Sequence, residues 1–453
     1  MGPFLEPPFP NLRCSPLGVI PKQEKDTFRL IHDLSFPLGN SVNSGIDPFY
    51  TEVHYDSIDT VVSLVKQHGR GALMAKTDIQ NAYRLLPIHP DDYELLGFSV
   101  EVEGQHYYFA DMCLPMGLNM SCQTFERFST ALHWVMETKY NSFISHMIDD
   151  FFFIGPPNTS VCADSLQNFM SLTQYLHIPI KASKTVNPTT TITIYGIEID
   201  SIQMVSRLPD EKVIKVRAAL SECLDKRKVT LKQLQSLLGL LNFVTLVVVP
   251  GRTFLRRLYD LTIGVAKPYY KVRLNNSAKA DIRIWHQFMQ GFNGRCMFMS
   301  DAWLASDYLK LFTDAASSKG YAAVLNSKWF YGTWPPQMQT MSINVQELFP
   351  IVLAIEHWGP LLRNHKLLVL SDNECVVFVI NKATSKCPHL MKLIRRLILA
   401  AIKYNILIRS KHIQGKSNLV ADCLSRFKFQ QARHWAPWLE TNPQILNQDL
   451  LKI

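Results

Sequence analysis

Residues 143–155 read Phe-Ile-Ser-His-Met-Ile-Asp-Asp-Phe-Phe-Phe-Ile-Gly, so two adjacent carboxylates, Asp149 and Asp150, lie inside a largely apolar run. A buried ion costs several kcal/mol unless a partner compensates it, and a like charge beside it adds to that cost. A bound cation explains the pair; an ordinary Asp-rich turn is the alternative that this stretch leaves open. The flanks predict two short strands with the acids at the bend. Because successive strand side chains face opposite ways, we expect one of the two acids to share a metal with a distant third acid.

The composition is that of a folded protein with more than one domain. A length of 453 residues predicts about two to four domains, and 47% hydrophobic with 19% charged residues excludes a disordered chain. The net charge of +9 favours a polyanionic partner. Nine cysteines without a C-x-x-C pair indicate reduced thiols of an intracellular protein. Residues 1–10 lack the pattern of a signal peptide, and the longest apolar run, residues 234–249, is broken by polar residues, so we expect a location in the cytoplasm or nucleus and no membrane partner.

The N-terminal part offers candidate ligand-binding residues before the acidic pair. Residues 17–35 predict a hairpin with Lys22 and Arg29 on its two arms, where the two cations could hold a triphosphate; solvated surface charges are the alternative. Asp78 falls at the end of a predicted buried strand, the usual place for a ligand-binding acid in an open sheet. Tyr83, one turn further, is predicted to contact a ligand or else to be a core aromatic.

Helical patterns carry two groups of basic residues. From residue 209 to about 260 the pattern is all helical, and Thr230 to Gln233 predict a capping box. A second helical stretch covers about 374–404. In the first stretch, Arg252, Arg256 and Arg257 share roughly one helix face suited to phosphate contact, with a solvated face as the alternative. In the second, Lys392, Arg395 and Arg396 cluster, and all six residues are candidates for nucleic-acid binding.

The C-terminal part supplies four further acids. Asp314 and Asp372 end predicted strands, whereas Glu347 and Asp422 lie on predicted helices. A two-metal phosphodiester hydrolase needs such a set, because two divalent ions about 3.5–4 Å apart activate a water and stabilise the leaving oxygen. Magnesium takes oxygen ligands, so carboxylates are suitable donors. His412 lies ten positions before Asp422 and is predicted to move protons or product; a structural histidine is the alternative.

These motifs in this order resemble a retroelement reverse transcriptase followed by a ribonuclease H. The residues that resemble the polymerase motifs are Thr77-Asp78 with Tyr83, Leu114-Pro115-Met116-Gly117, Met147-Ile148-Asp149-Asp150, Ile194-Tyr195-Gly196 and the thumb at 209–260. Residues 308–427 resemble the ribonuclease H, with the four acids and the run from His412 through Lys416 and Ser417 to Arg426 in the expected order. Residues 28–35 are similar to the tyrosine-recombinase retrotransposons of the DIRS/Ngaro group. Met147 stands where that family usually has an aromatic residue.

The resemblance implies a role for each candidate residue. Asp78 and Asp149, with Asp150 beside them, would hold the polymerase metals, and Tyr83 would exclude ribonucleotides. Lys22, Arg29, Met116 and Lys184 would bind the incoming nucleotide. Asp314, Glu347, Asp372 and Asp422 would hold the hydrolytic metals, with His412 assisting. The implied cofactor is Mg²⁺, two per active site, with Mn²⁺ as a possible substitute. The implied partners are an RNA template, a DNA primer, RNA–DNA hybrid and deoxynucleoside triphosphates, with the oligomeric state left open.

The expected fold is an α+β right-hand polymerase (fingers, palm and thumb) followed by an α/β ribonuclease H-like domain with a mixed five-stranded sheet. The expected boundaries are 1–206 for fingers and palm, 207–304 for thumb and connection, 305–427 for the ribonuclease H-like domain and 428–453 for a tail. No protease, integrase or recombinase signature is seen, so we expect one piece of a larger element product. Two alternatives remain: a non-catalytic nucleic-acid-binding remnant, or a ribonuclease H with an inactive polymerase.

Overall fold

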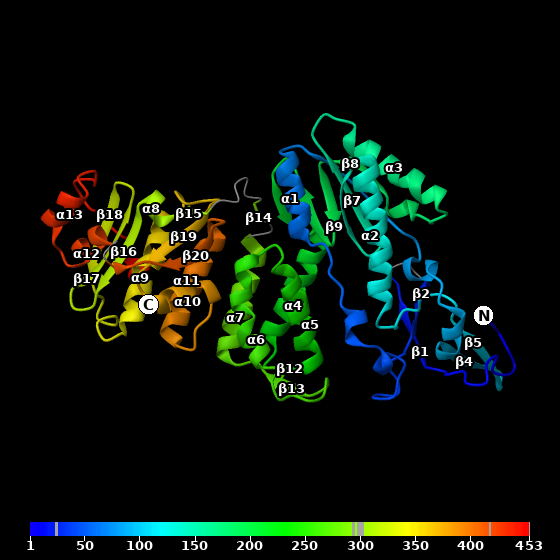
Figure 1. Ribbon diagram of the computed structural model, residues 1–453. Helices are drawn as coiled ribbons and strands as arrows, with labels where there is room; N and C mark the ends of the chain where they lie inside the picture. Colours follow the sequence, from blue (N-terminus) through cyan, green and yellow to red (C-terminus); the bar gives the residue numbers. More distant parts are fainter. Residues whose placement is uncertain (23–25, 292–294, 297–302, 416–417, 453) are drawn as a thin grey trace. The chain divides into compact units, whose positions relative to one another are not determined.

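The computed structural model describes residues 1–22, 26–291, 295–296, 303–415 and 418–452, and the chain divides into two compact units, Met1–Gln203 and Met204–Ile453 (Figure 1). This division lies near the predicted end of the palm at residue 206. In the described ranges, no helix is both long enough and apolar enough to cross a bilayer.

The first unit is built around a four-stranded antiparallel sheet in the order β6-β7-β3-β8. Its strands are β3 (Leu73–Asp78), β6 (Phe143–Met147), β7 (Asp150–Gly155) and β8 (Val186–Thr189). Phe151, Phe152 and Phe153 are all fully buried, so both faces of β7 are covered and the strand has no polar side. Phe151 and Phe153 pack in one core cluster with side chains of α2 (Ser121–Tyr140) and α3 (Val161–Tyr175), while α1 (Ile58–His68) contacts β6 and β7.

Three hairpins complete the first unit. They are β1–β2 (Leu17–Pro21 and Phe28–His32), β4–β5 (Gly97–Val102 and Gln105–Ala110) and β9–β10 (Thr191–Ile194 and Ile197–Asp200). Tyr195 and Gly196 join the last pair with φ of 49° and 77°, the positive values that tight hairpin turns require. Gly117 ends the Leu-Pro-Met-Gly turn at φ 124°, where a Cβ atom would lie 1.9 Å from the carbonyl oxygen of His32, so only glycine fits.

The second unit begins with a helical part. Its helices are α4 (Asp210–Asp225), α5 (Leu231–Val244), α6 (Arg256–Asp260) and α7 (Asn276–Gly291), and its short strand pairs are β12–β13 (Lys228–Thr230 and Lys271–Arg273) and β11–β14 (Val205–Arg207 and Arg295–Cys296). The predicted capping box is confirmed: the Thr230 hydroxyl accepts the Gln233 N–H at 3.2 Å, and the Gln233 side chain accepts the Thr230 N–H at 2.9 Å.

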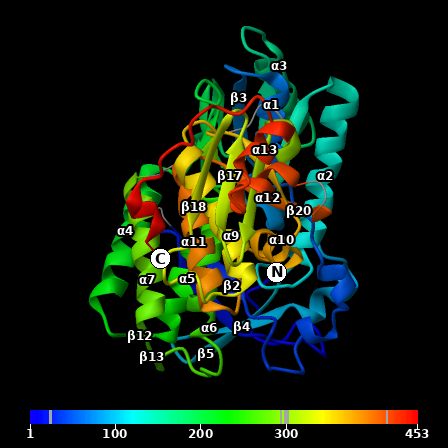
Figure 2. The ribbon, with the colours of Figure 1, turned by 90° about the vertical axis from the view of Figure 1, so that its left-hand side faces the viewer.

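The C-terminal part of this unit alternates strands and helices. An antiparallel meander joins β16 (Leu311–Ala316), β17 (Gly320–Leu325) and β18 (Lys328–Thr333), and a parallel set joins β15 (Leu304–Ala305), β19 (Lys366–Ser371) and β20 (Leu407–His412). The helices are α8 (Ser306–Leu309), α9 (Ile343–Trp358), α10 (Glu374–Lys382), α11 (Pro388–Lys403) and α12 (Leu419–Ser425), of which all but α8 are labelled in Figure 2.

These strands depart from the single five-stranded sheet that the sequence predicts. They form two three-stranded ladders, and β16 contacts β19 without joining its ladder. The additional strand β15 pairs with β19 instead. Just after β15, the Ser306 hydroxyl donates to the Leu368 carbonyl at 3.1 Å and accepts the Leu370 N–H at 3.0 Å. These bonds satisfy two backbone groups of β19.

The segment after residue 427, predicted as a tail, folds onto the same unit. It contains α13 (Phe429–Trp435), whose Ala432 is buried in a core cluster with Ala322 and Val324. Further along, the Gln444 side-chain oxygen accepts the Trp358 indole N–H at 2.8 Å. The segment therefore covers β17 and α9 rather than hanging free.

Candidate functional site

Three acids meet at one end of the first unit's sheet; Asp78, Asp149 and Asp150 are named here the hairpin acids. Antiparallel pairing of β3 with β7 places Asp78 directly opposite Asp150. Asp149 occupies the turn between β6 and β7, and its carbonyl oxygen accepts the Ile79 N–H at 3.0 Å. The predicted hairpin bend and its convergence with Asp78 are thus present in the structure, and Met147 pairs with Asp150 across the bend.

The turn that carries Asp149 is held from α2. Ile148 has φ 56°, a left-handed conformation that costs a β-branched residue about 1–3 kcal/mol. A Glu126 carboxylate oxygen accepts the Ile148 N–H at 2.8 Å, and the Ser129 hydroxyl donates to the Ile148 carbonyl at 2.5 Å. Sequence reasoning missed Glu126 and Ser129; their spacing of three on one helix face was the available signal.

The hairpin acids repel one another in a desolvated place. Burial raises the pKa of Asp150 to about 6, with the charges of Asp149 and Asp78 adding to the effect. Burial, and then the charge of Asp78, likewise raises the pKa of Asp149. Carboxylates in this state gain most from a cation, and their oxygens are the ligands that Mg²⁺ prefers. The donor set therefore fits the predicted divalent metal.

Lys184 is a cation already built into this site. Its ammonium group forms an ion pair with the Asp78 carboxylate, which is almost fully buried. Burial lowers the pKa of Lys184, but the hydrogen bond to Asp78 and the charges of Asp150 and Asp149 outweigh it and raise the pKa overall. In the structure, Lys184 thus pairs with Asp78, whereas the resemblance implied that it binds the nucleotide.

The other predicted nucleotide contacts lie on the nearby hairpin and turn. Arg29 is exposed on β2, and its charge lowers the pKa of Asp149 against the larger effect of burial, which places the guanidinium within electrostatic reach of the hairpin acids. Lys22 is exposed just after β1, and its N–H bonds the Thr27 carbonyl at 2.8 Å. The Met116 carbonyl accepts the His32 N–H at 2.8 Å, which ties the Leu-Pro-Met-Gly turn to β2.

Tyr83 packs on the core, as one of the two predicted alternatives has it, and its other side is near the hairpin acids. Its ring packs edge-on against Phe125 at 5.8 Å, and its hydroxyl lies 2.9 Å from the Cys122 sulfur. Burial is the main cause of its raised pKa, and the charge of Asp149 contributes. The ring is therefore anchored in the core on one side and close to the hairpin acids on the other.

A second group of acids meets in the second unit; Asp314, Glu347, Asp372 and Asp422 are named here the quartet. Burial raises the pKa of Glu347 to about 9, and the charges of Asp314, Asp372 and Asp422 add to it. Burial also raises the pKa of Asp314 to about 6, against a hydrogen bond from Ser425. The structure thus brings together the four acids that the sequence selected, from two strand ends and two helices.

Neighbouring side chains orient the quartet. The Ser425 hydroxyl donates to Asp314 at 2.5 Å, and Arg426 Nε donates to Asp422 at 2.8 Å. His412 is exposed, and its Nε2 lies 3.1 Å from the backbone oxygen of Asp372. The predicted motif also includes Lys416 and Ser417, which lie outside the described residues.

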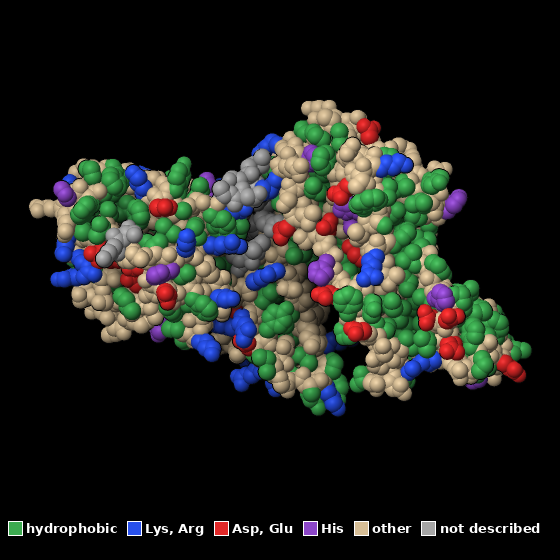
Figure 3. All heavy atoms as spheres, in the orientation of Figure 1, with side chains coloured by type: hydrophobic (Ala, Val, Ile, Leu, Met, Phe, Trp, Pro, Cys, Tyr) green, Lys and Arg blue, Asp and Glu red, His purple; other side chains and the backbone are tan. Residues whose placement is uncertain are grey.

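The two predicted basic groups meet at a hollow of about 210 Å³ in the second unit. Arg256 and Arg257 of α6 line it together with Lys386 and Arg395, while Asp260 is the acid in its lining. Figure 3 shows Lys and Arg side chains gathered over α6, α7 and α11. Such a concentration of cations suits a phosphate group.

Not every predicted basic residue faces this hollow. Arg396 donates to both oxygens of Glu356 and to two backbone carbonyls, so these donors are used inside the unit, and its contact with nucleic acid stays a prediction. Arg395 lines the hollow but also forms an ion pair with the fully buried Asp281. Lys392 and Arg252 are exposed, and Arg252 Nε lies 3.4 Å from the Thr245 hydroxyl.

Comparisons with known proteins bear on the first unit most directly. Residues 20–199 match the family model described as Reverse transcriptase (RNA-dependent DNA polymerase). Protein P of Duck hepatitis B virus, in a Shanghai isolate and in a brown Shanghai duck isolate, is 25% identical over 239 residues, which are 52% of this chain and 29% of the viral protein. The chain thus spans less than a third of the length of these curated relatives. The prediction of a reverse transcriptase domain is confirmed.

Solved structures share the fold over most of the chain. A foamy viral protease–reverse transcriptase in complex with dsDNA has a TM-score of 0.50 and 17% identity, and the match covers 89% of this chain and 78% of that one. A dRH form of the foamy viral protein, in complex with ds DNA, gives a TM-score of 0.50 and 16% identity, covering 88% of this chain and 65% of that one. These likenesses confirm a polymerase fold.

Proposed function

We propose that this chain copies RNA into DNA as the polymerase of a retroelement, of the DIRS/Ngaro type, and that it also cuts the RNA strand of RNA–DNA hybrids. The observation that carries the proposal is the meeting of Asp78, Asp149 and Asp150 at one sheet end, inside the segment that matches the reverse transcriptase family. The cysteines, taken as reduced thiols, and the net charge, which favours a polyanionic partner, both suit a protein that acts in the cytoplasm or nucleus.

In the polymerase reaction, a primer 3′-hydroxyl attacks the α-phosphorus of a deoxynucleotide, and pyrophosphate leaves. The hairpin acids would hold two Mg²⁺ or Mn²⁺ ions, which neutralise charge on the attacking and leaving oxygens. Arg29 and Lys22 bind the triphosphate electrostatically from the β1–β2 hairpin. Lys184 keeps part of the negative charge of Asp78 compensated before the nucleotide arrives.

In the hydrolytic reaction, water attacks a phosphodiester of the RNA strand and a ribose hydroxyl leaves. The quartet would hold the Mg²⁺ ions, which activate that water. Ser425 and Arg426 orient two of the four carboxylates, and Glu347, with its pKa raised to about 9 by burial, is the acid that holds a proton most readily near neutral pH. His412, exposed beside Asp372, moves a proton or product.

Hybrid binding would rest on backbone contacts. The hollow lined by Arg256, Arg257, Lys386 and Arg395 offers cations to a phosphate, so affinity should fall as salt rises. Shape of the hybrid then matters more than its sequence.

Primer extension on poly(rA)·oligo(dT) with Mg²⁺, run beside a hybrid-cleavage assay, tests the proposal. We expect Asp149→Asn to reduce extension by about 10³-fold or more and to spare cleavage, and Asp372→Asn to do the reverse, because each removes a charge that only one reaction uses. Extension unchanged in Asp149→Asn would refute the polymerase assignment. Hybrid cleavage without primer extension in the wild type would favour a ribonuclease H with an inactive polymerase. The absence of both activities would favour a nucleic-acid-binding remnant.

The nucleotide choice gives a separate test. Tyr83→Ala should raise ribonucleotide incorporation relative to deoxynucleotide by about 10-fold or more, since the ring beside the hairpin acids would exclude a 2′-hydroxyl. Tyr83→Phe keeps the ring and should keep the ratio, while losing the contact with Cys122. An unchanged ratio in Tyr83→Ala removes this role.

A further inference from the structure

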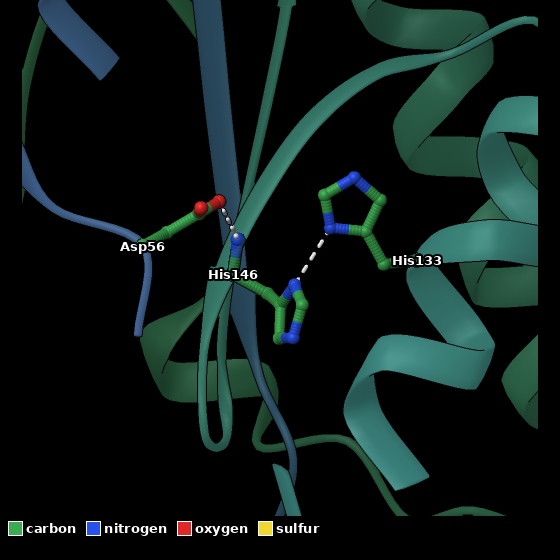
Figure 4. A group of neighbouring side chains, drawn as sticks. All are labelled: Asp56, His133 and His146. Carbon is green, nitrogen blue, oxygen red and sulfur yellow. Dashed lines mark hydrogen bonds between the residues drawn. The ribbon is translucent and has the colours of Figure 1, made fainter. Parts of the chain in front are cut away.

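A third group of potential metal ligands lies in the first unit, apart from both sets of acids. It consists of Asp56, just before α1, His133 on α2 and His146 on β6, and is named here the histidine cluster (Figure 4). Among the described residues, this is the group of three whose ligand atoms all lie within 4.8 Å of one another. Nothing in the proposed polymerase or nuclease reaction uses it.

The two imidazole rings face each other through their Nδ1 atoms. His133 Nδ1 and His146 Nδ1 are 2.6 Å apart. The far nitrogens face carboxylates: His133 Nε2 lies 3.2 Å from Glu137 and His146 Nε2 lies 3.3 Å from Glu126. With each Nε2 protonated toward the carboxylate that it faces, each Nδ1 presents its lone pair to the other ring. Two lone pairs at that distance repel unless a positive charge lies between them.

Metal-ligating histidines are arranged in the same way, with the second ring nitrogen facing a carboxylate that fixes the tautomer. The His146 side of the cluster is dry, since the His146 and Glu126 side chains are 8% and 9% exposed, whereas His133 is 17% exposed and its partner Glu137 is 57% exposed. Asp56 is oriented as well: its Oδ2 accepts the Ser145 hydroxyl at 2.8 Å and the His146 N–H at 3.4 Å.

We propose that the histidine cluster binds a divalent transition-metal ion of the zinc class through His133 Nδ1, His146 Nδ1 and a carboxylate oxygen of Asp56. Two imidazoles with one carboxylate select zinc or cobalt over magnesium. Nitrogens about 2.0–2.1 Å from a tetrahedral zinc are about 3.3 Å apart, so the rings need to separate by less than an ångström. The fourth position is left to water.

The site joins the elements that position the hairpin acids. One Glu126 oxygen faces His146 Nε2, and the other accepts the N–H of Ile148, the residue before Asp149. A metal here would therefore stiffen the β6–β7 turn from behind by fixing α2 to β6. Its effect on primer extension rests on the proposed function, whereas metal binding itself does not.

Cobalt titration of the full-length chain tests the proposal, with about 5 mM Mg²⁺ present to occupy the carboxylate sites. We expect one Co²⁺ per chain with visible absorption, displacement by Zn²⁺, and a Tm raised by several degrees with Zn²⁺. His133→Asn and the isosteric Asp56→Asn should each lose absorption and shift, with folding checked by circular dichroism. The exposed His89→Asn, whose side chain is 70% exposed, should keep both.

Two results would overturn the inference. One is Co²⁺ absorption that is equal in wild type, His133→Asn and Asp56→Asn. The other is no Co²⁺ binding together with a proton shared between the two rings in nitrogen-15 NMR, which would make the pair a hydrogen bond and not a metal site. An Asp149→Asn chain that binds Co²⁺ normally but does not extend a primer keeps the two proposals separate.

Discussion

The hairpin acids and the quartet are both sets of buried carboxylates that repel one another, and they differ in how the protein alone relieves that repulsion. Lys184 forms an ion pair with one of the hairpin acids, and burial raises the pKa of another, Asp150, to about 6. In the quartet, Ser425 and Arg426 each bind one acid, yet burial and three neighbouring charges still raise the pKa of Glu347 to about 9. The quartet therefore relieves its repulsion by holding a proton at neutral pH rather than by an ion pair with a lysine, and without metal its unit should lose stability where that proton is lost.

The quartet should show this dependence as a pH effect on unfolding. Glu347 titrates near 4.5 when unfolded and about 9 when folded, so in this window the folded state holds a proton that the unfolded state has lost. In EDTA, the free energy of unfolding of the second unit should therefore fall as pH rises from 6 to 9, by about 1 kcal/mol per pH unit. Urea unfolding at several pH values measures the slope, and Mg²⁺ should flatten it.

Glu347→Gln makes this prediction sharper. The variant should lose the slope, be more stable than wild type at pH 8 in EDTA, and cleave hybrid about 10³-fold more slowly, because it removes both the repulsion and a metal ligand. Glu211→Gln, at an exposed position on α4 of the same unit, should keep the slope and the activity. A slope that survives in Glu347→Gln would mean that the contrast between the two acid sets is wrong.

Lys184→Met tests the other side of the comparison. Without its cation, the almost fully buried Asp78 loses its charge partner, so the first unit should lose about 1 kcal/mol of stability in EDTA, a value kept small because the lysine is half exposed. Extension should fall about 10-fold, while less Mg²⁺ is needed for half-maximal rate, since the ammonium no longer competes for Asp78. Cleavage should not change, and Lys319→Met, an exposed lysine of the second unit, serves as control. A higher Mg²⁺ requirement would contradict the competition.

The sequence could identify the acids but not the side chains that contact and orient them. Asp149 and Asp150 stand out because charges are rare in apolar runs, and Glu347 stands out because it falls at a predicted helix start. Local sequence pattern reveals both features. The contact of Lys184 with Asp78 depends on how two segments 106 residues apart pack, which no local pattern encodes. The same holds for His133 and His146, which resemble ordinary core histidines until α2 and β6 lie side by side.

The strand arrangement and one basic residue show the same limit. The sequence predicts the strands β16 to β20. It does not predict that β15 and the Ser306 hydroxyl bond β19, or that the strands form two ladders. Arg396 has the spacing of a phosphate-binding residue, yet its bidentate contact with Glu356 becomes visible only in the folded unit.

The smallest expected effect concerns the backbone rather than the charges. The hairpin acids rely on a turn in which Ile148 is held in a left-handed conformation, whereas Asp314 and Asp372 lie within or just after regular strands. Ser129→Ala removes the hydroxyl that bonds the Ile148 carbonyl, a bond of about 1 kcal/mol, and should lower extension by a few-fold with cleavage unchanged. Ser63→Ala, which removes a similar hydroxyl-to-carbonyl bond on α1, is the matched control. Equal extension by both variants would show that the Glu126 bond alone maintains the turn. The hairpin acids would then be no more sensitive to backbone strain than the quartet.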